Sequence, residues 1–399
     1  MISLTTLREA IDEIARLNLS DPVLDRASAV LRLKKSMPHL DRETLSIAID
    51  TYFSRGNAGA KLGNWAQNGY FSVDILEQAS RQAISIHRSS FFSGLKHVLE
   101  IGTGTGADTA SLARVAHQVT TIEADASRAE LASENLRIQG INNVTVIVGD
   151  VESACASLDL NSFDGLFADP ARRTRDGKRV REASDYSPPL DFLISLPVGR
   201  VRAIKVSPGL FFDLPNTSWR RHFIGVGDEC LEQSLLFGVP VADSSVYRAD
   251  LQVGWAPDIS VSPPIFETRE LGGYICEAHA LINRSQYLSL FFAERGIAQI
   301  SSDVAYGISD VIPANDPFLD SFRIVDAAQF STSRLQRMLE ARGWTSRTEF
   351  KKRNCSLDLD AVRTSLRLPP HSHQAPFGTV FLFKWHGSYQ VVLGERVCD

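Results

Sequence analysis

The chain has 399 residues, 44% of them hydrophobic and 22% charged, a composition typical of a globular protein with roughly two or three domains. Its formal net charge of −5 provides no global attraction for nucleic acid, so an anionic partner would require local basic patches. We expect no membrane span, because no apolar run approaches about 20 residues, and no signal peptide, because the N-terminus carries acids. Five scattered cysteines without a CxxC pair indicate reduced thiols in the cytoplasm and no zinc site.

Residues 1–95 predict a helical region. One face of a first helix would be formed by apolar residues at helical spacing, Leu7, Ile11, Ile14 and Leu17. Asp41 would open a later helix that stops before Gly56. A further helix is expected from Ser72 to about Phe92.

Beyond this region the pattern changes to short β-branched strands that alternate with helices. The expected strands read HVLEIG, VTTIEAD, VTVIVGD, FDGLFAD and RAIKVS. The expected helices read DTASLARVA, SRAELASENLRI and PLDFLISL, the second opened by a capping box of Ser127 and Glu130. This alternation predicts a parallel sheet covered on both faces, with LEQSLLFG and VYRADLQV as an antiparallel hairpin at one edge.

The proline- and serine-rich segment 256–268 is the best candidate for a domain boundary. A mixed α/β tail follows it. The final part, 329–399, reads helix, strand, helix, strand, strand and ends in GTVFLFKW and SYQVVLG.

The stretch LEIGTGTGAD lies where the first strand turns into a helix. Gly102, Gly104 and Gly106, with Thr103 between them, allow close approach of the backbone to a ligand. Such a loop binds either S-adenosylmethionine (SAM) or a dinucleotide. Glu100 and the Gly-x-Gly-x-Gly spacing favour SAM and leave a dinucleotide-dependent oxidoreductase as the weaker alternative.

Acidic residues end three further strands. Glu123 is placed to accept hydrogen bonds from ribose hydroxyls, and Asp150 to hold an adenine amino group. Asp169-Pro170 would lie beside the sulfonium, where Asp169 orients the methyl acceptor or takes its proton. The carboxyl ends of parallel strands meet at one edge of a sheet, so these acids predict one ligand site.

The Asp-Pro corner departs from the Asp/Asn-Pro-Pro-aromatic pattern of amine methyltransferases. Ala171 and Arg172 replace the second proline and the aromatic residue, so this loop lacks a platform for a flipped base. A basic run follows, formed by Arg172, Arg173, Arg175, Lys178, Arg179 and Arg181. These side chains would either clamp substrate phosphates or pair with acids and lie on a solvated face.

Further basic residues are candidates for substrate contacts. Lys205 lies within a strand, which indicates either a pocket residue or a buried ion-pair partner. The segment 331–367 has nine basic residues against four acids. The nine are Arg334, Arg337, Arg342, Arg347, Lys351, Lys352, Arg353, Arg363 and Arg367. His371 and His373 have no further ligands at metal spacing, so we expect no metal site.

Together these motifs resemble class I SAM-dependent methyltransferases that carry a C-terminal THUMP-like domain. The resemblance extends from about residue 64 to 399 and includes ADPARR, IKVSPGL, GDECLEQSLLFG, GYICEAHALINRS and AERGIAQISSDVAYGISD. It implies an α/β fold with a Rossmann-like seven-stranded core. The implied parts are an N-terminal helical region (1–95), a methyltransferase domain (96–258), a ferredoxin-like α+β domain (264–328) and a THUMP-like domain (329–399).

The resemblance also implies roles for individual residues. The cofactor would be SAM, held by Glu100, Gly102, Gly104, Glu123 and Asp150. The catalytic corner would be Asp169, Pro170, Arg172 and Arg173.

Our first hypothesis is a cytoplasmic enzyme that methylates RNA, most plausibly tRNA. Its substrate would contact Lys178, Arg179, Lys205, Arg347, Lys351 and Lys352. The alternatives are a methyltransferase for a protein or small metabolite, and a SAM-binding nucleic-acid module without turnover. The sequence leaves the modified atom and the oligomeric state open.

Overall fold

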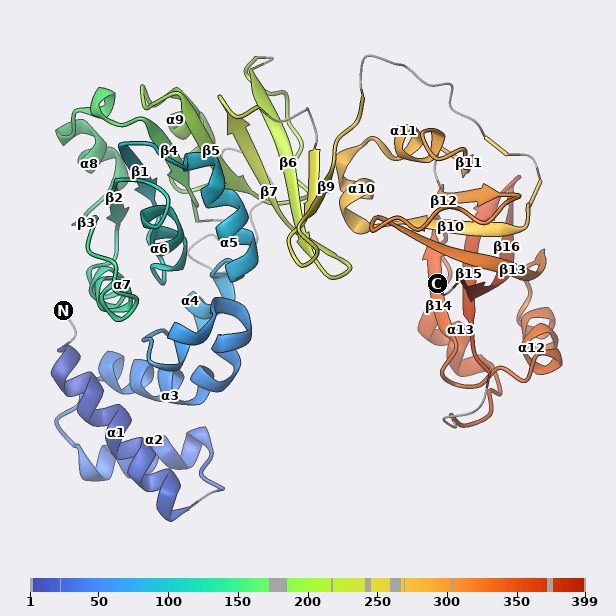
Figure 1. Cartoon of the computed structure of the whole chain (residues 1–399). Coiled ribbons are helices and arrows are strands. Elements are labelled where there is room, and N and C mark those ends of the chain that lie inside the picture. Colours follow the sequence, from blue (N-terminus) through green and yellow to red (C-terminus); the bar gives the residue numbers. More distant parts are fainter. Residues whose placement is uncertain are drawn as a thin grey trace. The chain divides into compact units, whose positions relative to one another are not determined.

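The computed structural model describes residues 3–21, 23–171, 185–216, 218–240, 245–258, 267–268, 270–302, 304–371 and 376–397. The chain divides into two compact units (Figure 1). The first comprises Met1–Ile224 and Leu231–Val241, and the second comprises Gly225–Cys230 and Ala242–Asp399. The four-part division expected from the sequence stays a prediction.

The first unit begins with helices that pack on one another. They are α1 (Leu4–Ser20), α2 (Arg26–Ser36), α3 (Arg42–Leu62), α4 (Val73–Gln78) and α5 (Gln82–Ser89). Side chains of Ser3, Asp25 and Asp41 cap the first three by accepting hydrogen bonds from backbone amides. The predicted face of α1 is confirmed: Leu7, Ile11 and Ile14 are buried, and Leu17 packs against them.

Two predicted helix ends are wrong. The third helix continues through Gly56 and stops only at Gly63, whose backbone φ is +91°. Glycine within a helix costs about 1 kcal/mol, and the packing of the flanking Ala58 and Leu62 in the core offsets that cost. The single helix expected from Ser72 is broken into α4 and α5, because Ala79 adopts an extended backbone.

A sheet follows, built from β1 (His97–Ile101), β2 (Gln118–Glu123), β3 (Val144–Val148), β4 (Gly165–Ala168), β5 (Val201–Val206), β6 (Trp219–Val226) and β7 (Glu229–Phe237). Neighbouring strands run in the order β3-β2-β1-β4-β5-β7-β6. The first five are parallel, whereas β7 is antiparallel to β5. The predicted parallel sheet is confirmed.

Helices cover both faces of this sheet. They are α6 (Ala107–Ala113), α7 (Ala126–Ile138), α8 (Val151–Ser157) and α9 (Leu190–Ser195). In β1, Leu99 and Ile101 pack in one core with α8 and α9, whereas Val98 packs in another with α6. Because side chains alternate along a strand, Glu100 shares the α6 face with Val98.

Two local predictions in this region are wrong. Helix α7 is capped by Asp125, which accepts from the Arg128 amide, so Ser127 lies inside the first turn. The hairpin partner of β7 is β6 rather than the following strand. The β6–β7 turn passes through Gly227 with φ +60°, and adjacent arginines (Arg220, Arg221) had obscured the strand pattern of β6.

The second unit contains the hairpin strands β8 (Ser245–Arg248) and β9 (Val253–Trp255) and a second sheet. The strands of that sheet are β10 (Tyr274–Ala278), β11 (Ala298–Ser301), β12 (Val304–Ser309), β13 (Leu319–Gln329), β14 (Glu349–Arg353), β15 (Thr379–Trp385) and β16 (Ser388–Arg396). Its order is β11-β12-β10-β13-β16-β15-β14. The helices are α10 (Ala280–Ser285), α11 (Leu288–Ala293), α12 (Thr332–Ala341) and α13 (Leu359–Ser365).

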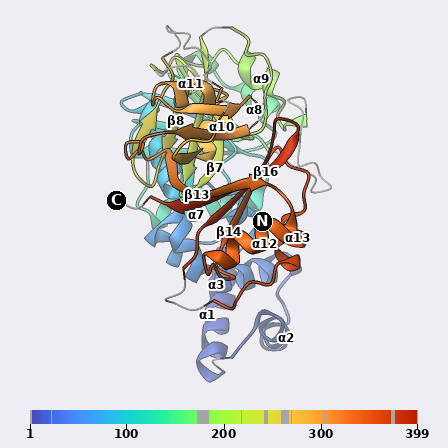
Figure 2. The same ribbon diagram turned by 90° about the vertical axis from the view of Figure 1, so that its right-hand side faces the viewer.

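The predicted order of elements in 329–399 is confirmed. Leu335 of α12 and Val362 of α13 pack in one core with alternate residues of β15 and β16. Figure 2 shows the ribbons of α12 and α13 next to that of β14. In the part of the chain that the structure describes, no helix is long and apolar enough to cross a membrane.

Gly238, directly after β7, lies where the backbone of this strand approaches the residues that precede β5. Gly238 and Gly140 both have left-handed backbones, with φ +70° and +71°. A Cβ at Gly238 would lie 1.6 Å from the Arg200 carbonyl oxygen, whereas one at Gly140 meets nothing within 4 Å. We expect Gly140→Ala to lower the free energy of unfolding by about 1 kcal/mol, and Gly238→Ala by roughly 1–3 kcal/mol more. Urea unfolding measures both; equal losses would contradict the close approach.

Candidate functional site

The loops after β1 and β4 touch at the carboxyl end of the sheet. Backbone hydrogen bonds run from Gly102 to Ile122 at 3.0 Å and from Asp169 to Ile101 at 2.9 Å. A Cβ at Gly102 would lie 2.7 Å from the carbonyl oxygen of Asp169. Glycine at position 102 therefore allows the glycine-rich loop and the Asp169 corner to meet.

The other two glycines shape the same loop. Gly104 has φ +57° and open space where a side chain would stand. The Gly106 amide donates to the Thr103 carbonyl at 2.9 Å, and a Cβ there would lie 3.2 Å from the Ala132 carbonyl of α7. The loop is thus tight against α7 on one side and open at Gly104, a shape that suits close approach of a ligand.

Glu123, at the end of β2, secures this loop. Its buried carboxylate accepts hydrogen bonds from the Gly104 amide at 3.1 Å and the Asp125 amide at 3.2 Å. A carboxylate has about four lone-pair sites, so two backbone bonds leave it able to accept from ligand hydroxyls.

Thr103 and Asp150 have local partners. The buried Thr103 hydroxyl lies 2.7 Å from the Thr121 hydroxyl, so this side chain faces the sheet rather than the open side of the loop. The exposed Asp150 carboxylate caps α8 by accepting from the Ser153 amide at 3.0 Å, a bond that lowers the pKa of Asp150. Asp150 is therefore ionised at neutral pH, with one oxygen engaged in the cap.

Glu100 is completely buried beneath α6. Within the described residues, neither of its carboxylate oxygens has a hydrogen-bond partner. Burial raises the pKa of Glu100 to about 8, and this effect outweighs the nearby Thr109 and Thr121 hydroxyls, which favour the ionised form. At neutral pH this side chain is predominantly the uncharged acid, so a direct ionic contact with a ligand does not follow from the structure.

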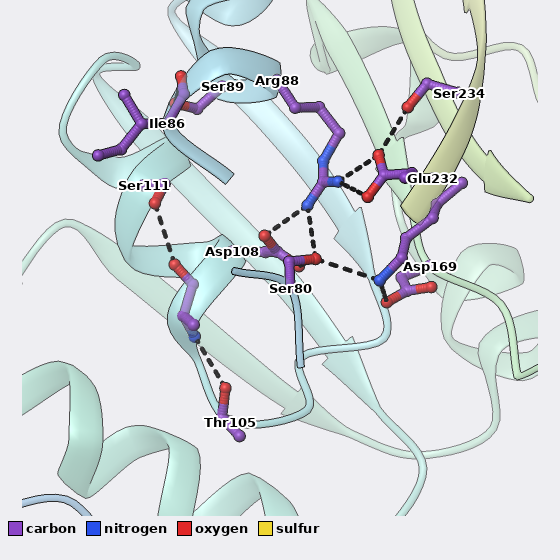
Figure 3. Close-up of polar contacts among 12 residues, drawn as sticks. Ser80, Ile86, Arg88, Ser89, Thr105, Asp108, Ser111, Asp169, Glu232 and Ser234 are labelled. Carbon is purple, nitrogen blue, oxygen red and sulfur yellow. Dashed lines mark hydrogen bonds and ion pairs between the residues drawn. The ribbon is translucent and has the colours of Figure 1, made fainter. Parts of the chain in front are cut away.

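A buried network of charged side chains lies on the same side of the sheet as Glu100 (Figure 3). Arg88, on α5, is 2% exposed and donates to both carboxylate oxygens of Glu232 on β7. It also donates to Asp108 of α6 at 2.5 Å and to the Ser80 hydroxyl at 3.1 Å. The Ser234 hydroxyl donates to Glu232 at 2.8 Å.

The network reaches the Asp-Pro corner through Lys205 of β5. The Lys205 ammonium donates to the Ser80 hydroxyl at 3.1 Å and to the Asp169 carboxylate at 2.7 Å. Lys205 is buried, whereas the Asp169 side chain is 24% exposed. Asp169 is thus the point at which the buried network meets the open end of the sheet.

Both acids that flank Arg88 are charged. Burial disfavours their ionised forms, but the guanidinium keeps the pKa values of Asp108 and Glu232 below their ordinary ranges. Removing one member of such a buried pair typically costs about 3–5 kcal/mol, because the opposite charge is left uncompensated. The network therefore holds α5, α6 and β7 together.

The sequence prediction covered part of this arrangement. The buried ion-pair alternative for Lys205 describes its contact with Asp169. Arg88, Asp108 and Glu232 were missed, although Asp108 lies inside LEIGTGTGAD and Glu232 inside GDECLEQSLLFG. The only indication in the sequence was a charged residue among apolar ones. The sequence does not show which acid will form an ion pair with such an arginine.

The basic run behind the corner lies outside the described residues. This applies to Arg172, Arg173, Lys178 and Arg179. The buried Pro170 and the following Ala171 are described, and Ala171 exchanges backbone hydrogen bonds with Ser187 at 2.9 and 3.2 Å.

The basic residues predicted in the second unit have different environments. Lys351 and Arg353 of β14 both pair with the buried Glu277 of β10. Lys352 is exposed and donates to the Leu357 carbonyl at 2.7 Å. Exposed Arg347 lies over the Phe377 ring at 3.8 Å. Lys351 thus has an internal ion-pair partner, whereas Arg347 and Lys352 present their charges at the surface.

No cluster of three or more potential metal ligands occurs in the described parts of the chain. Cys155, Cys276 and Cys355 are free thiols.

Comparisons with known proteins give the class of this fold and site. Residues 98–180 match a family model described as a methyltransferase domain, and residues 319–396 match one described as THUMP domain-like. A solved structure assigned to a methyltransferase of Porphyromonas gingivalis W83 superposes with a TM-score of 0.75 at 19% identity, covering 98% of this chain and 99% of that one. The fold is that of a Rossmann-like methyltransferase with additional domains.

Curated proteins with similar sequences are also methyltransferases. An uncharacterized S-adenosylmethionine-dependent methyltransferase of Mycobacterium tuberculosis is 25% identical over 336 residues, which cover 80% of this chain and 88% of that protein. A protein-L-isoaspartate O-methyltransferase of Magnetococcus marinus is 54% identical over 54 residues, only 14% of this chain and 24% of that protein. The chain is a SAM-dependent methyltransferase with a THUMP-like C-terminal part.

The buried Glu100 predicts a pH-dependent stability. Between its ordinary pKa near 4.5 and its raised value of about 8, the folded state keeps a proton that the unfolded state releases. The contribution of Glu100 to stability therefore falls as pH rises through this window. We expect Glu100→Gln to match the wild type near pH 4.5 and to exceed it above pH 8, on the order of a few kcal/mol.

Chemical unfolding of both proteins across this pH range measures the difference. Comparing variant with wild type cancels the titration of all other groups. A difference that does not change with pH would show that Glu100 is ionised in the folded protein.

Proposed function

We propose that this methyltransferase modifies RNA, with tRNA as the most plausible substrate. The observation that carries the proposal is the THUMP domain-like match at 319–396, in a part of the chain that exposes many basic side chains. These are Arg334, Arg337, Arg347, Lys352, Arg363 and Arg367. Phosphate contacts by such side chains would supply the local attraction that an acidic protein otherwise lacks.

We propose that the glycine-rich loop and two acids hold the cofactor. The open face of Gly104 suits the methionine part of SAM, and Glu123 has acceptor sites left for the ribose hydroxyls. Asp150 retains one carboxylate oxygen for the adenine edge. Thr103 contributes through its backbone, because its hydroxyl is bonded to Thr121.

The chemistry proposed for the corner rests on Asp169. SAM, when bound, would supply an electrophilic methyl group, because that methyl group is attached to a positively charged sulfur. Asp169 would orient the acceptor and receive the proton it gives up. Lys205, at 2.7 Å, fixes the position of the Asp169 carboxylate. We assign Lys205 the role of a positioning residue.

The charge of the network suits binding of a sulfonium cation. Formally, Arg88 and Lys205 carry two positive charges against three negative charges on Asp108, Glu232 and Asp169. One negative charge is therefore in excess in the network as a whole, and in surroundings of low dielectric constant it favours a nearby cation.

A second candidate acceptor is a protein carboxyl group. The short match to protein-L-isoaspartate O-methyltransferase favours it, although that match spans only 24% of that protein. The missing aromatic residue at the Asp-Pro corner is compatible with this alternative, since a carboxyl acceptor needs no stacking platform.

Transfer of tritium-labelled methyl groups to total RNA from cells lacking this protein tests the proposal. We expect label in the tRNA-sized fraction. Asp169→Asn should reduce the rate, measured at saturating SAM, about 100-fold or more by removing the proton acceptor. Asp191→Asn, an exposed change on α9, is the matched control.

Label in protein but not in RNA would overturn the RNA substrate and support the carboxyl alternative. Equal rates for Asp169→Asn and the control would overturn the role of Asp169.

RNA binding can be tested separately from turnover. We expect Arg347→Glu and Lys352→Glu each to weaken binding of a tRNA-sized RNA and to reduce the slope of log K against log salt by about 1. Lys384→Glu, an exposed change on β15 outside the basic segment, is the control. Lys351 is unsuitable, because charge reversal there would place two carboxylates together at Glu277.

Filter binding at several salt concentrations measures these slopes. If all three variants retain the wild-type slope, the basic surface of 331–367 does not contact RNA.

A further inference from the structure

A polar pocket of about 270 Å³ lies in the N-terminal part of the first unit, away from the Asp169 corner in sequence. It is formed by α1, α3, the segment that follows α3, and α7. Its polar lining comprises Arg8, Arg55, Asn68, Tyr70, Glu134 and Arg137, together with Asp12. None of these residues belongs to the cofactor site proposed above.

Two of the three arginines share one acid. Arg8 lies 2.5 Å from Glu134 and also donates to the Tyr70 hydroxyl at 3.1 Å. Arg137 donates to both oxygens of the same Glu134 at 2.8 Å. Glu134 is nearly buried at 6% exposure, whereas Arg8 and Arg137 are 46% and 68% exposed, so the shared acid anchors two guanidiniums that remain open to solvent at the pocket.

Arg55 differs from both. It donates only to the backbone carbonyls of Gly69 and Asn68, at 3.2 and 3.3 Å, and its guanidinium lies 5.5 Å from the centre of the Tyr70 ring. Among the residues that the structure describes, it forms no ion pair. Burial lowers the pKa of Arg55, because it removes part of the charge from water, and the nearby Tyr70 and Asp12 side chains oppose that shift only in part.

The pocket therefore has an excess of positive charge. Three guanidiniums face two carboxylates, Asp12 and Glu134, and Glu134 is already engaged by two of them. The exposed Asn68 amide and the Tyr70 hydroxyl add neutral hydrogen-bonding groups to the lining. A partly buried guanidinium without an ion pair among the described residues, in a pocket where arginines outnumber acids, is an environment suited to an anion with several oxygens.

The pocket is also connected to the glycine-rich loop. Asn135 of α7, which is completely buried, accepts from the Tyr70 amide at 2.8 Å and donates to the Tyr70 carbonyl at 2.9 Å. The same amide group donates to the Thr105 carbonyl at 3.0 Å. Asn135 thereby links Tyr70, which lines the pocket, to the backbone of the loop that we propose to hold SAM.

We propose that this pocket binds a phosphoryl group, with Arg55 as its principal ligand. The planar guanidinium fork matches the oxygens of a phosphate, and the anion would supply the charge that Arg55 lacks in the protein. The phosphoryl group has two sources, the backbone of an RNA or a small phosphorylated molecule. The site does not depend on the proposed methyl transfer, because binding alone defines it.

Titration calorimetry with inorganic phosphate, together with filter binding of a tRNA-sized RNA, tests the site. Arg55→Met should weaken whichever ligand occupies the pocket about tenfold or more. Arg55→Lys keeps the charge without the fork and should lose less. Arg16→Met removes an arginine from α1 that is 74% exposed and paired with Glu13, and serves as the matched control.

Three outcomes are distinguishable. Loss of phosphate affinity with RNA binding unchanged supports a small phosphorylated ligand. Loss of RNA affinity, with the salt slope reduced by about 1, supports the RNA backbone. If neither ligand responds to Arg55→Met or Arg55→Lys more than to Arg16→Met, the site does not bind phosphoryl groups. Thermal unfolding of Arg55→Lys, the milder change, confirms that a loss of affinity is not a loss of folding.

Discussion

The buried guanidinium of Arg88 is the interaction on which the methyltransferase core depends. It joins α5, α6 and β7 by binding Asp108 and Glu232, and through Ser80 it adjoins the ion pair of Lys205 and Asp169. A charge in this position has no water to compensate it, so every partner has to be in place when the core forms. The same constraint that holds the sheet together therefore also positions the side chain proposed to act on the methyl acceptor.

Acids that lie close together in this core differ in protonation: some are ionised and one is protonated. The neighbouring side chains determine which form each acid takes. Asp108 and Glu232 are ionised because Arg88 lies against them, whereas Glu100, equally buried but without a hydrogen-bond partner in the described residues, is held near neutral by its pKa of about 8. A protonated Glu100 adds no further negative charge to a region that already carries an excess. Of the acids in the network, Asp169 is the one that lies at the open end of the sheet.

The second unit shows how internal pairing changes a charge pattern read from sequence. Lys351 and Arg353 alternate with Lys352 on β14, and the first two pair with Glu277, a residue more than 70 positions earlier in the chain. The basic surface available to a partner is therefore smaller than the count of basic residues in 331–367 indicates. Arg347, which stacks on the exposed ring of Phe377, and Lys352 are basic residues of this segment whose charges remain exposed to solvent.

Local sequence by itself determined the five parallel strands of the core with the helices α6, α7 and α9, the order of elements in 329–399, and the glycine turn at Gly102. These properties depend on periodicity and on single-residue backbone preferences. Tertiary structure alone decided the pairing of β7 with β6, the path of α3 through Gly56, and the choice of Glu232 and Asp108 as partners of Arg88. Those outcomes depend on which residues, distant in sequence, come into contact in a core without water. Burial makes each of these pairings necessary, and no local sequence pattern specifies them.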